Sequence, residues 1–370
     1  MRTTMDPETK AARASLTDGF GREHTDMRIS LTDKCNFRCV YCMREDQRFN
    51  LTRLELDTPE LVRVARIAHN LGIRTIRLTG GEPLMRKDAI DVVRQLSTIG
   101  FDDISMTTNG SLLTRKVGGI TAAQALREAG LNRLNISCDS LQPDKFAKIR
   151  RRGDFDVVMA GIAEAHRVGF SPIKMNTVVI RGQNEDEILD FANYVRESWE
   201  AGTPISVRFI EFMPLGETGE KQENWTKDKV VRSADIVKMI GDQWPLKISS
   251  SQKDHAPASR WAFQDGKGEI GVIPTMTNPF CANCNRLRIT GDGFVMRCLF
   301  SRKDSKYALR NLMRRDGGCT DEEIAQAFLA AVASKRAGQD RDTPDIFENP
   351  GKYVGGSQAV HQVSMSQIGG

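Results

Sequence analysis

Residues 27–42 of this 370-residue chain read MRISLTDKCNFRCVYC. The first part, Met27–Thr32, has the short apolar pattern of a buried β-strand. Three cysteines then follow within eight residues, at Cys35, Cys39 and Cys42. Three thiolates at this spacing can surround one soft-metal centre. The stretch therefore predicts a strand whose carboxyl end opens into a metal-binding loop.

Short β-like runs like the first one recur along the chain and alternate with helical patterns. Further strands are predicted at Arg74–Thr79, Ile104–Thr108, Arg133–Cys138, Ile173–Ile180 and Ile205–Phe212. Helices are predicted at Pro59–Leu71 with Thr58 as N-cap, Asp88–Ile99, Phe155–Val168 with Asp154 as N-cap, and Glu185–Trp199. Six strands that alternate with helices indicate an α/β fold with a parallel sheet, two βα units short of an eight-stranded barrel.

The pattern changes after Phe212. A helix at Ser233–Asp242, short strands around Trp261, Ile270, Leu287 and Val295, and a helix at Asp321–Ser334 predict a smaller α+β C-terminal domain. We expect a leader at residues 1–26, a barrel domain at 27–245, the C-terminal domain at 246–336, and a flexible tail at 337–370.

The composition restricts the class of protein. Hydrophobic residues make up 39% of the chain and charged residues 27%, which is typical of a globular protein. Neither a membrane span nor a secretory signal is predicted, because long apolar runs are missing. We therefore expect a cytoplasmic location, where clustered cysteines bind metals or do chemistry more often than they form disulfides. The net charge of +5 suits an anionic small molecule as well as a nucleic acid.

The first cysteine group permits more than one kind of site. Three cysteines on a four-iron cluster would leave one iron open to an exogenous ligand. A zinc site with a distant fourth ligand, or unrelated loop thiols, are the alternatives.

The C-x3-C-x2-C loop, with Tyr41 before its last cysteine, resembles the signature of radical S-adenosylmethionine (SAM) enzymes. The resemblance implies a partial (β/α)6 TIM-like barrel and a [4Fe–4S] cluster held by Cys35, Cys39 and Cys42. It further implies that the open iron chelates SAM, which reduction cleaves to methionine and a 5′-deoxyadenosyl radical. Gly80-Gly81-Glu82-Pro83 is similar to the family's motif for the SAM amino group, and Ser137 to its SAM-binding serine.

A second group comprises Cys281, Cys284 and Cys298. By spacing alone it fits zinc and an iron–sulfur cluster about equally. Arg286 and Arg288 follow two residues apart, so they share one face of a strand. The stretch FCANCNRLRITGDGFVMRCLF resembles the C-terminal motif of the MoaA family of GTP 3′,8-cyclases. That resemblance implies a second [4Fe–4S] cluster whose open iron meets the guanine of GTP.

The same resemblance extends over nearly the whole chain and implies roles for further residues. For SAM it implies Tyr41, Gly81, Glu82, Ser137 and Met213. For GTP it implies Arg28, Arg77, Thr107, Lys174, Arg208, Arg286 and Arg288. The terminal Gly369 and Gly370 match the family's C-terminal double glycine, whose tail reaches the active site. The chain departs from the family at Thr75, next to Arg74, where a second basic residue is frequent.

Cations within the predicted strands also indicate a polyanionic substrate, independently of the resemblance to the family. Arg28, Arg77, Lys174 and Arg208 lie within apolar strand patterns, and a buried cation requires a counter-charge. With Arg286 and Arg288 they could converge on one polyanion such as a triphosphate. Pairing of each cation with a nearby carboxylate is the alternative.

The resemblance implies conversion of GTP to (8S)-3′,8-cyclo-7,8-dihydroguanosine 5′-triphosphate, the first step of molybdenum cofactor biosynthesis. It implies two [4Fe–4S] clusters and SAM as cofactors, a reducing electron donor, and a downstream MoaC-type cyclic pyranopterin monophosphate synthase. A homodimer stays open, and no membrane or nucleic-acid partner is expected.

Two other functions remain open at this point. One is a different twin-cluster radical SAM enzyme that matures a peptide. The other is a non-enzymatic zinc or RNA-binding module. Cys138 and Cys319 fit no motif, and we expect a core residue at the first and a surface or packing thiol at the second.

Overall fold

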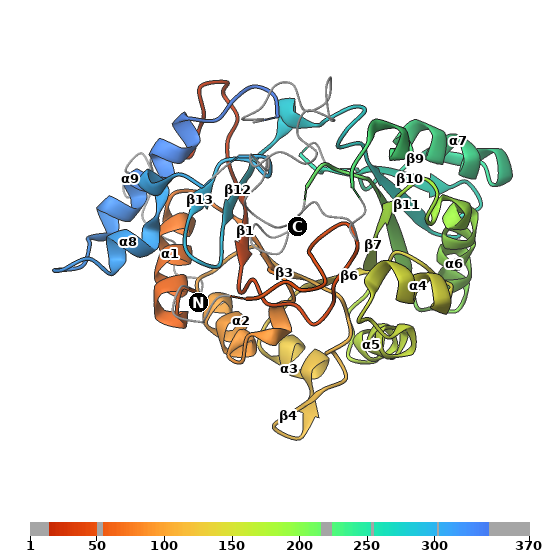
Figure 1. The fold of residues 1–370 in the computed structure, drawn as a ribbon, viewed down its shortest axis with the longest axis horizontal. Helices are drawn as coiled ribbons and strands as arrows, with labels where there is room; N and C mark the ends of the chain where they lie inside the picture. Colours follow the sequence, from red (N-terminus) through yellow and green to blue (C-terminus); the bar gives the residue numbers. More distant parts are fainter. Residues whose placement is uncertain (1–14, 50–54, 216–223, 253–254, 302, 340–370) are drawn as a thin grey trace, which may run out of the picture.

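The computed structural model describes residues 15–49, 55–215, 224–252, 255–301 and 303–339. In this part of the chain, eleven strands form one sheet in the order β13-β12-β1-β2-β3-β6-β7-β8-β11-β10-β9. The sheet curves into a partial barrel with helices around its outside (Figure 1). The predicted α/β partial barrel is thus confirmed.

The central strands agree with the six predicted ones to within two residues at each end. They are β1 (Asp26–Ser30), β2 (Thr75–Thr79), β3 (Asp103–Thr108), β6 (Arg133–Ser137), β7 (Ile173–Val179) and β8 (Ile205–Glu211). Each is parallel to the next. Their carboxyl ends therefore meet at one end of the barrel, where the loop of the first cysteine group begins.

Helices on the outer face connect these strands. They are α1 (Thr58–Asn70), α2 (Ala89–Ser97), α3 (Ala122–Glu128), α4 (Pro143–Arg150), α5 (Phe155–Arg167) and α6 (Ile188–Glu200). Short 3-10 turns precede α2 and α6, η3 (Pro83–Met85) and η4 (Glu185–Glu187), and a small hairpin precedes α3, β4 (Lys116–Val117) with β5 (Ile120–Thr121). The sequence did not predict α4, which is short.

The predicted N-cap of the first helix was wrong by one residue. Asp57 caps α1, because its side chain accepts from Glu60 N while the Glu60 side chain accepts from Asp57 N. Thr58 instead donates its hydroxyl to Asp88. The predicted N-cap Asp154 is confirmed, since its carboxylate accepts from Val157 N.

The strands alternate between an apolar outer face and a polar inner face. Met27 and Ile29 of β1 belong to the hydrophobic core, whereas Arg28 lies on the opposite face of the strand. The same alternation places polar side chains inside the barrel along the other central strands, namely Arg77, Ser105, Asn135, Ser137, Lys174, Asn176 and Arg208.

The C-terminal part extends the same sheet at both edges. Its elements are η5 (Lys227–Lys229), α7 (Ser233–Gln243), β9 (Leu246–Ile248), β10 (Ser259–Phe263), β11 (Glu269–Ile273), η6 (Cys281–Asn283), β12 (Arg286–Ile289), β13 (Val295–Met296), η7 (Ser305–Tyr307), α8 (Leu309–Met313) and α9 (Asp321–Ala333). β11 pairs in parallel with β8, and β12 pairs in parallel with β1. In Figure 1, β12 and β13 accordingly lie at one side of the barrel and β9–β11 at the other. The described residues between 246 and 336 thus extend the barrel sheet and do not build a separate one.

The segment before β1 is packed from residue 15 onward, which differs from the loose leader expected there. Leu16 and His24 are buried, and the backbone N–H of Thr25 donates to the carbonyl of Asn285. The tail from residue 340, with Gly369 and Gly370, lies outside the described residues. Among the described helices, none combines the length and apolar composition needed to cross a bilayer.

Candidate functional site

The first cysteine group lines a pocket at the carboxyl ends of the central strands. The pocket holds about 110 Å³. Several loops contribute to it, with Cys35, Cys39, Tyr41 and Cys42 after β1, Gly81 after β2, Thr107 and Thr108 at the end of β3, Ser137 at the end of β6, and Arg150 from α4. The structure therefore brings together the three cysteines and three of the predicted SAM residues, Tyr41, Gly81 and Ser137.

Backbone hydrogen bonds hold the cysteine loop in place. The N–H groups of Arg38 and Val40 donate to the carbonyls of Arg150 and Ile149, and the N–H of Phe37 donates to Cys35 Sγ at 3.4 Å. On the other side, Gly81 N donates to Thr32 O at 2.8 Å. The loop is thus fixed between α4 and the β2 loop.

The donor set fits an iron–sulfur cluster. Within the described residues, no three His, Cys, Asp or Glu side chains converge as ligands of a single metal ion. A cubane does not need that convergence, because each thiolate binds a different iron. Burial raises the pKa of Cys35 to about 12 and also raises that of Cys39. These thiols release their protons when a metal binds, so loading depends on pH.

The glycine loop after β2 needs its second glycine for steric reasons. A Cβ on Gly81 would stand 2.3 Å from Lys34 O and 2.6 Å from Asp33 O, so only glycine allows the two loops to approach. Glu82 is fully buried and does not line the pocket. Its carboxylate accepts from Leu84 N, Thr108 Oγ1 and Asn109 N. In this structure Glu82 therefore joins the β2 and β3 loops.

The second cysteine group lines a separate pocket of about 70 Å³ with Met213, Arg286 and Arg288. Cys281 and Cys284 lie at η6, directly before β12, and Cys298 follows β13. Lys335 connects these segments, because its Nζ donates to the carbonyls of Arg286 and Arg297. Burial raises the pKa of Cys284, but the charges of Arg286 and Lys335 outweigh it and lower that pKa to about 7.

The two cysteine groups lie at opposite ends of the barrel. β12 is parallel to β1, and β13 is antiparallel to β12. Segments before β12 and after β13 therefore meet at the amino end of β1, whereas the first cysteine loop follows its carboxyl end. A molecule that occupies the barrel interior therefore lies between the two groups.

That interior carries the predicted cations. Arg288, Arg28 and Arg77 occupy adjacent register positions on β12, β1 and β2, and Lys174 and Arg208 follow on β7 and β8. Arg77 Nε donates to Ser105 Oγ, and Arg208 Nη1 donates to Asn135 Oδ1, each at 3.3 Å. Both acceptors are neutral, so these two bonds supply no counter-charge to either guanidinium.

The cations repel one another. Burial, followed by the charges of Arg208, Arg133, Arg77 and Arg260, lowers the pKa of Lys174 to about 6. Burial and three of these arginines likewise lower the pKa of Arg208 to about 9. Among the described residues, Arg28 Nε is buried without a hydrogen-bond partner. A polyanion in the interior would therefore relieve the repulsion among these buried cations.

Comparison with known proteins identifies the family. A model described as the radical SAM superfamily matches residues 29–195, and one described as molybdenum cofactor synthesis C matches residues 205–340. A GTP 3′,8-cyclase of Syntrophomonas wolfei is 41% identical over 326 residues, which cover 87% of this chain and 94% of that protein. The chain belongs to the GTP 3′,8-cyclase family.

Other relatives are similarly identical to this chain. A GTP 3′,8-cyclase of Limosilactobacillus fermentum is 43% identical over 77% of this chain and 82% of that protein. Molybdenum cofactor biosynthesis protein 1 of Homo sapiens is 42% identical over 87% of this chain and 48% of that protein. The chain thus spans about half the length of this animal relative. The crystal structure of Streptococcus suis SuiB bound to S-adenosylmethionine shares the fold, with a TM-score of 0.54 and 13% identity over 81% of this chain and 72% of that one.

For a GTP 3′,8-cyclase, the predicted residues fall into three places. Tyr41, Gly81, Thr107 and Ser137 line the first pocket. Met213, Arg286 and Arg288 line the second pocket. The remaining predicted GTP-binding cations, Arg28, Arg77, Lys174 and Arg208, lie on central strands of the barrel.

Sequence reasoning missed three arginines near the GTP 3′,8-cyclase site. Arg133 and Arg260 influence the charge of Lys174, but each has a carboxylate partner, Asp103 and Glu269. Arg150 contacts the first cysteine group from α4. Arg133 begins a predicted strand and could have been found by its alternation, whereas Arg150 carries no local signal.

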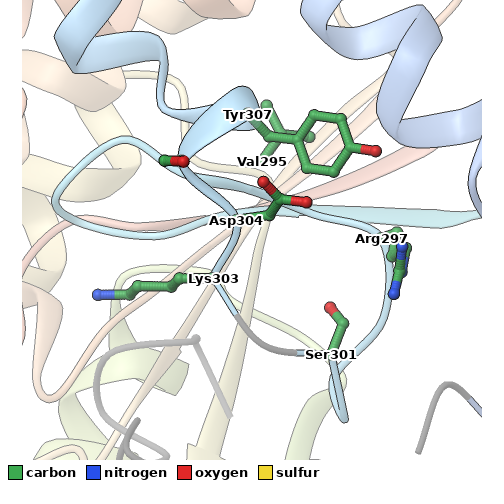
Figure 2. Close-up of a pocket in the computed structure, with 7 residues that line it drawn as sticks. Val295, Arg297, Ser301, Lys303, Asp304 and Tyr307 are labelled. Atoms are coloured by element: carbon green, nitrogen blue, oxygen red, sulfur yellow. The ribbon is translucent and has the colours of Figure 1, made fainter. Parts of the chain in front are cut away.

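A further pocket of about 380 Å³ adjoins the second one at Arg297. Figure 2 shows its polar lining, with Ser301, Lys303 and Asp304 around the opening and Tyr307 beside them. Lys303 is already paired with Asp292 at 2.7 Å, and Ser301 Oγ donates to Cys298 O. The Ser301 hydroxyl thus supports the Cys298 loop.

Proposed function

We propose that this chain is a radical SAM enzyme that converts GTP to (8S)-3′,8-cyclo-7,8-dihydroguanosine 5′-triphosphate in molybdenum cofactor biosynthesis. The observation that carries the proposal is the position of the two cysteine groups at opposite ends of a barrel interior lined with cations. Family membership makes SAM and [4Fe–4S] clusters the cofactors.

In this proposal Cys35, Cys39 and Cys42 hold the cluster that binds SAM, and Cys281, Cys284 and Cys298 hold the cluster that faces the substrate. When bound, the first cluster supplies the electron that cleaves SAM and so provides a radical for hydrogen abstraction. The chemistry of the donor set supports the assignment, because thiolates are the ligands that such clusters prefer.

The protein's own residues bind and orient the substrate. Arg28, Arg77, Lys174 and Arg208 surround the space in which the triphosphate lies, and Arg286 and Arg288 direct the guanine end toward the second cysteine group. Tyr41, Gly81 and Ser137 position SAM at the other end. Enclosure in the barrel excludes water, so that the reactive carbon meets only the intended hydrogen.

Glu82 also belongs to the proposed SAM site, through the loop that it fixes. Its carboxylate holds the loop containing Gly81 against the β3 loop. Met213, which is proposed to contact SAM, lines the second pocket. Thr107, which is proposed to contact GTP, lines the first pocket. The tail with Gly369 and Gly370 is proposed to reach the site by its resemblance to the family.

Several wider assignments are part of the same proposal. A reducing donor supplies electrons, and a MoaC-type synthase consumes the product. A cytoplasmic location fits two pockets lined by free cysteines, which require a reducing compartment. Assembly as a homodimer is also proposed. We keep the division into a barrel at 27–245 and a cluster-bearing region at 246–336 as a functional one, despite the shared sheet.

The decisive experiment is anaerobic incubation of the reconstituted protein with dithionite, SAM and GTP. We expect about eight irons per chain, 5′-deoxyadenosine and a cyclised nucleotide. Arg288→Ala should abolish the nucleotide product but leave uncoupled SAM cleavage. About four irons would exclude the second cluster. 5′-Deoxyadenosine without a nucleotide product would favour another substrate, such as a peptide, and bound zinc without SAM cleavage would favour a non-enzymatic module.

A further inference from the structure

Arg150 is the last residue of α4, and it contacts a ligand of the first proposed cluster. Its side chain is 4% exposed. The guanidinium Nη1 donates to Cys39 Sγ at 3.3 Å, and Nη2 lies 2.8 Å from Asp139 Oδ2. Arg150 also lines the pocket of the first cysteine group. A buried cation is therefore in direct contact with a cluster-binding sulfur.

The partner of Arg150 is held from several sides. Asp139 is 1% exposed, and the Oδ2 atom that is ion-paired with Arg150 accepts a hydrogen bond from Tyr41 Oη at 2.8 Å. Its other oxygen accepts from Val178 N at 2.9 Å. The Arg150–Asp139 ion pair and the Tyr41–Asp139 hydrogen bond thus connect α4, the segment after β6 and the cysteine loop in one buried network.

The backbone around Arg150 keeps the guanidinium in this position. The carbonyls of Ile149 and Arg150 accept from Val40 N and Arg38 N. The next residue, Arg151, has φ 58°, and no other described non-glycine residue has a positive φ. This strained turn bends the chain away directly after Arg150. The carbonyl of Arg150, directly before this turn, is hydrogen-bonded to the cysteine loop.

A cationic donor changes the electronic properties of the sulfur that it contacts. Hydrogen bonds to cluster sulfurs and nearby charge both set the reduction potential of an iron–sulfur cluster. A charged donor gives the stronger bond, and burial strengthens its effect because the surroundings have a low dielectric constant. The reduced cluster carries one more negative charge, so a neighbouring cation favours the reduced form.

We propose that Arg150, acting through Cys39, raises the reduction potential of the cluster held by Cys35, Cys39 and Cys42, and that Asp139 limits this effect. Arg150 is thus a positioning residue that makes the SAM-binding cluster easier to reduce. The inference rests on the proposed function, because it requires that cluster.

The test is an anaerobic redox titration of the reconstituted enzyme, followed by electron paramagnetic resonance. Addition of SAM identifies the signal of the cluster that binds it, and the second cluster serves as an internal reference. Arg150→Gln should lower the ratio of reduced to oxidised SAM-binding cluster about tenfold at a fixed potential, which corresponds to about 59 mV for a one-electron couple. Asp139→Asn should move the same ratio in the opposite direction.

Arg152→Gln is the matched control, because Arg152 is two residues away and pairs with Glu45 through a half-exposed side chain. It should leave both potentials unchanged, and the second cluster should keep its potential in all variants. Opposite shifts in Arg150→Gln and Asp139→Asn identify an electrostatic role, because a merely structural defect would move both variants in the same direction.

The proposal is overturned if Arg150→Gln keeps its irons and leaves the reduction potential of the SAM-binding cluster unchanged. It is also overturned if Asp139→Asn lowers that potential. If the Arg150→Gln protein does not assemble the first cluster, the direction in which Asp139→Asn shifts the reduction potential is the test of the proposal. A wild-type protein with no SAM-sensitive cluster would instead refute the proposed function, which separates the two failures.

Discussion

Lys174 is the group in the barrel interior whose charge we expect GTP binding to change. It lies on β7 and faces Arg208, Arg133, Arg77 and Arg260, which together with burial lower its pKa to about 6. A bound triphosphate would place negative charge among these cations and return the pKa of Lys174 toward its usual value of about 10.4. The free enzyme and the complex would then differ by one proton over a wide pH range.

The sign and size follow from the two pKa values. At pH 8 the Lys174 amine of the free enzyme is about 1% protonated, whereas the amine of the complex is almost fully protonated. Binding of GTP should therefore take up about one proton. Because the complex has the higher pKa, binding weakens as the pH rises above 6, by up to tenfold or about 1.4 kcal/mol per pH unit.

Isothermal titration calorimetry can measure this uptake at pH 8, with GTP, without SAM, and in buffers of different ionisation enthalpy. The slope of the binding enthalpy against the buffer enthalpy gives the number of protons. Lys174→Gln is neutral at every pH and is the control, because protons exchanged by the γ-phosphate are common to both proteins. Equal proton uptake in the wild type and Lys174→Gln would refute the reasoning.

Three further predictions follow from the loops, the cations and the tail. Gly81→Ala forces a Cβ against Lys34 O and should lose the irons of the first cluster but keep those of the second. The control Gly241→Ala meets nothing within 4 Å and should keep both; equal iron content would contradict the steric argument. Arg208→Met should stabilise the ligand-free protein by about 1–2 kcal/mol, because it removes a buried like charge, but should weaken GTP binding. A melting temperature of ligand-free Arg208→Met below that of the wild type would contradict the expected stabilisation. Deletion of Gly369 and Gly370 should suppress nucleotide cyclisation at an unchanged melting temperature, and full activity would mean that the tail has no role.

Much of the barrel could be predicted because the relevant signals are local. The β-branched runs of β1 to β8 alternate with amphipathic helices, and each pattern depends on neighbours a few residues away. Gly130 directly follows the C-cap of α3 with φ of 98°, a conformation that glycine adopts without strain at a helix end. The short helix α4 was missed, since its sequence contains few apolar repeats.

The edges of the sheet could not be predicted in the same way. β12 pairs with β1 although the two segments are about 260 residues apart, as the bond from Asn285 to Thr25 shows. β11 pairs with β8 in the same non-local manner. Their sequences are short and indicate a strand but not its partner, so we expected a separate C-terminal domain where the structure has one sheet.

By itself, the sequence determined which residues have the chemistry: two groups of three cysteines, a glycine loop and a set of cations within strands. These are properties of residue type and spacing, which no folding changes. Only the tertiary structure decided where they lie. It placed the cysteine groups at opposite ends of one barrel and aligned Arg288, Arg28 and Arg77 in register. It also brought Arg150 from a short helix against Cys39. Such contacts depend on the pairing of distant segments, which hydrophobic burial and strand register select for the whole chain at once.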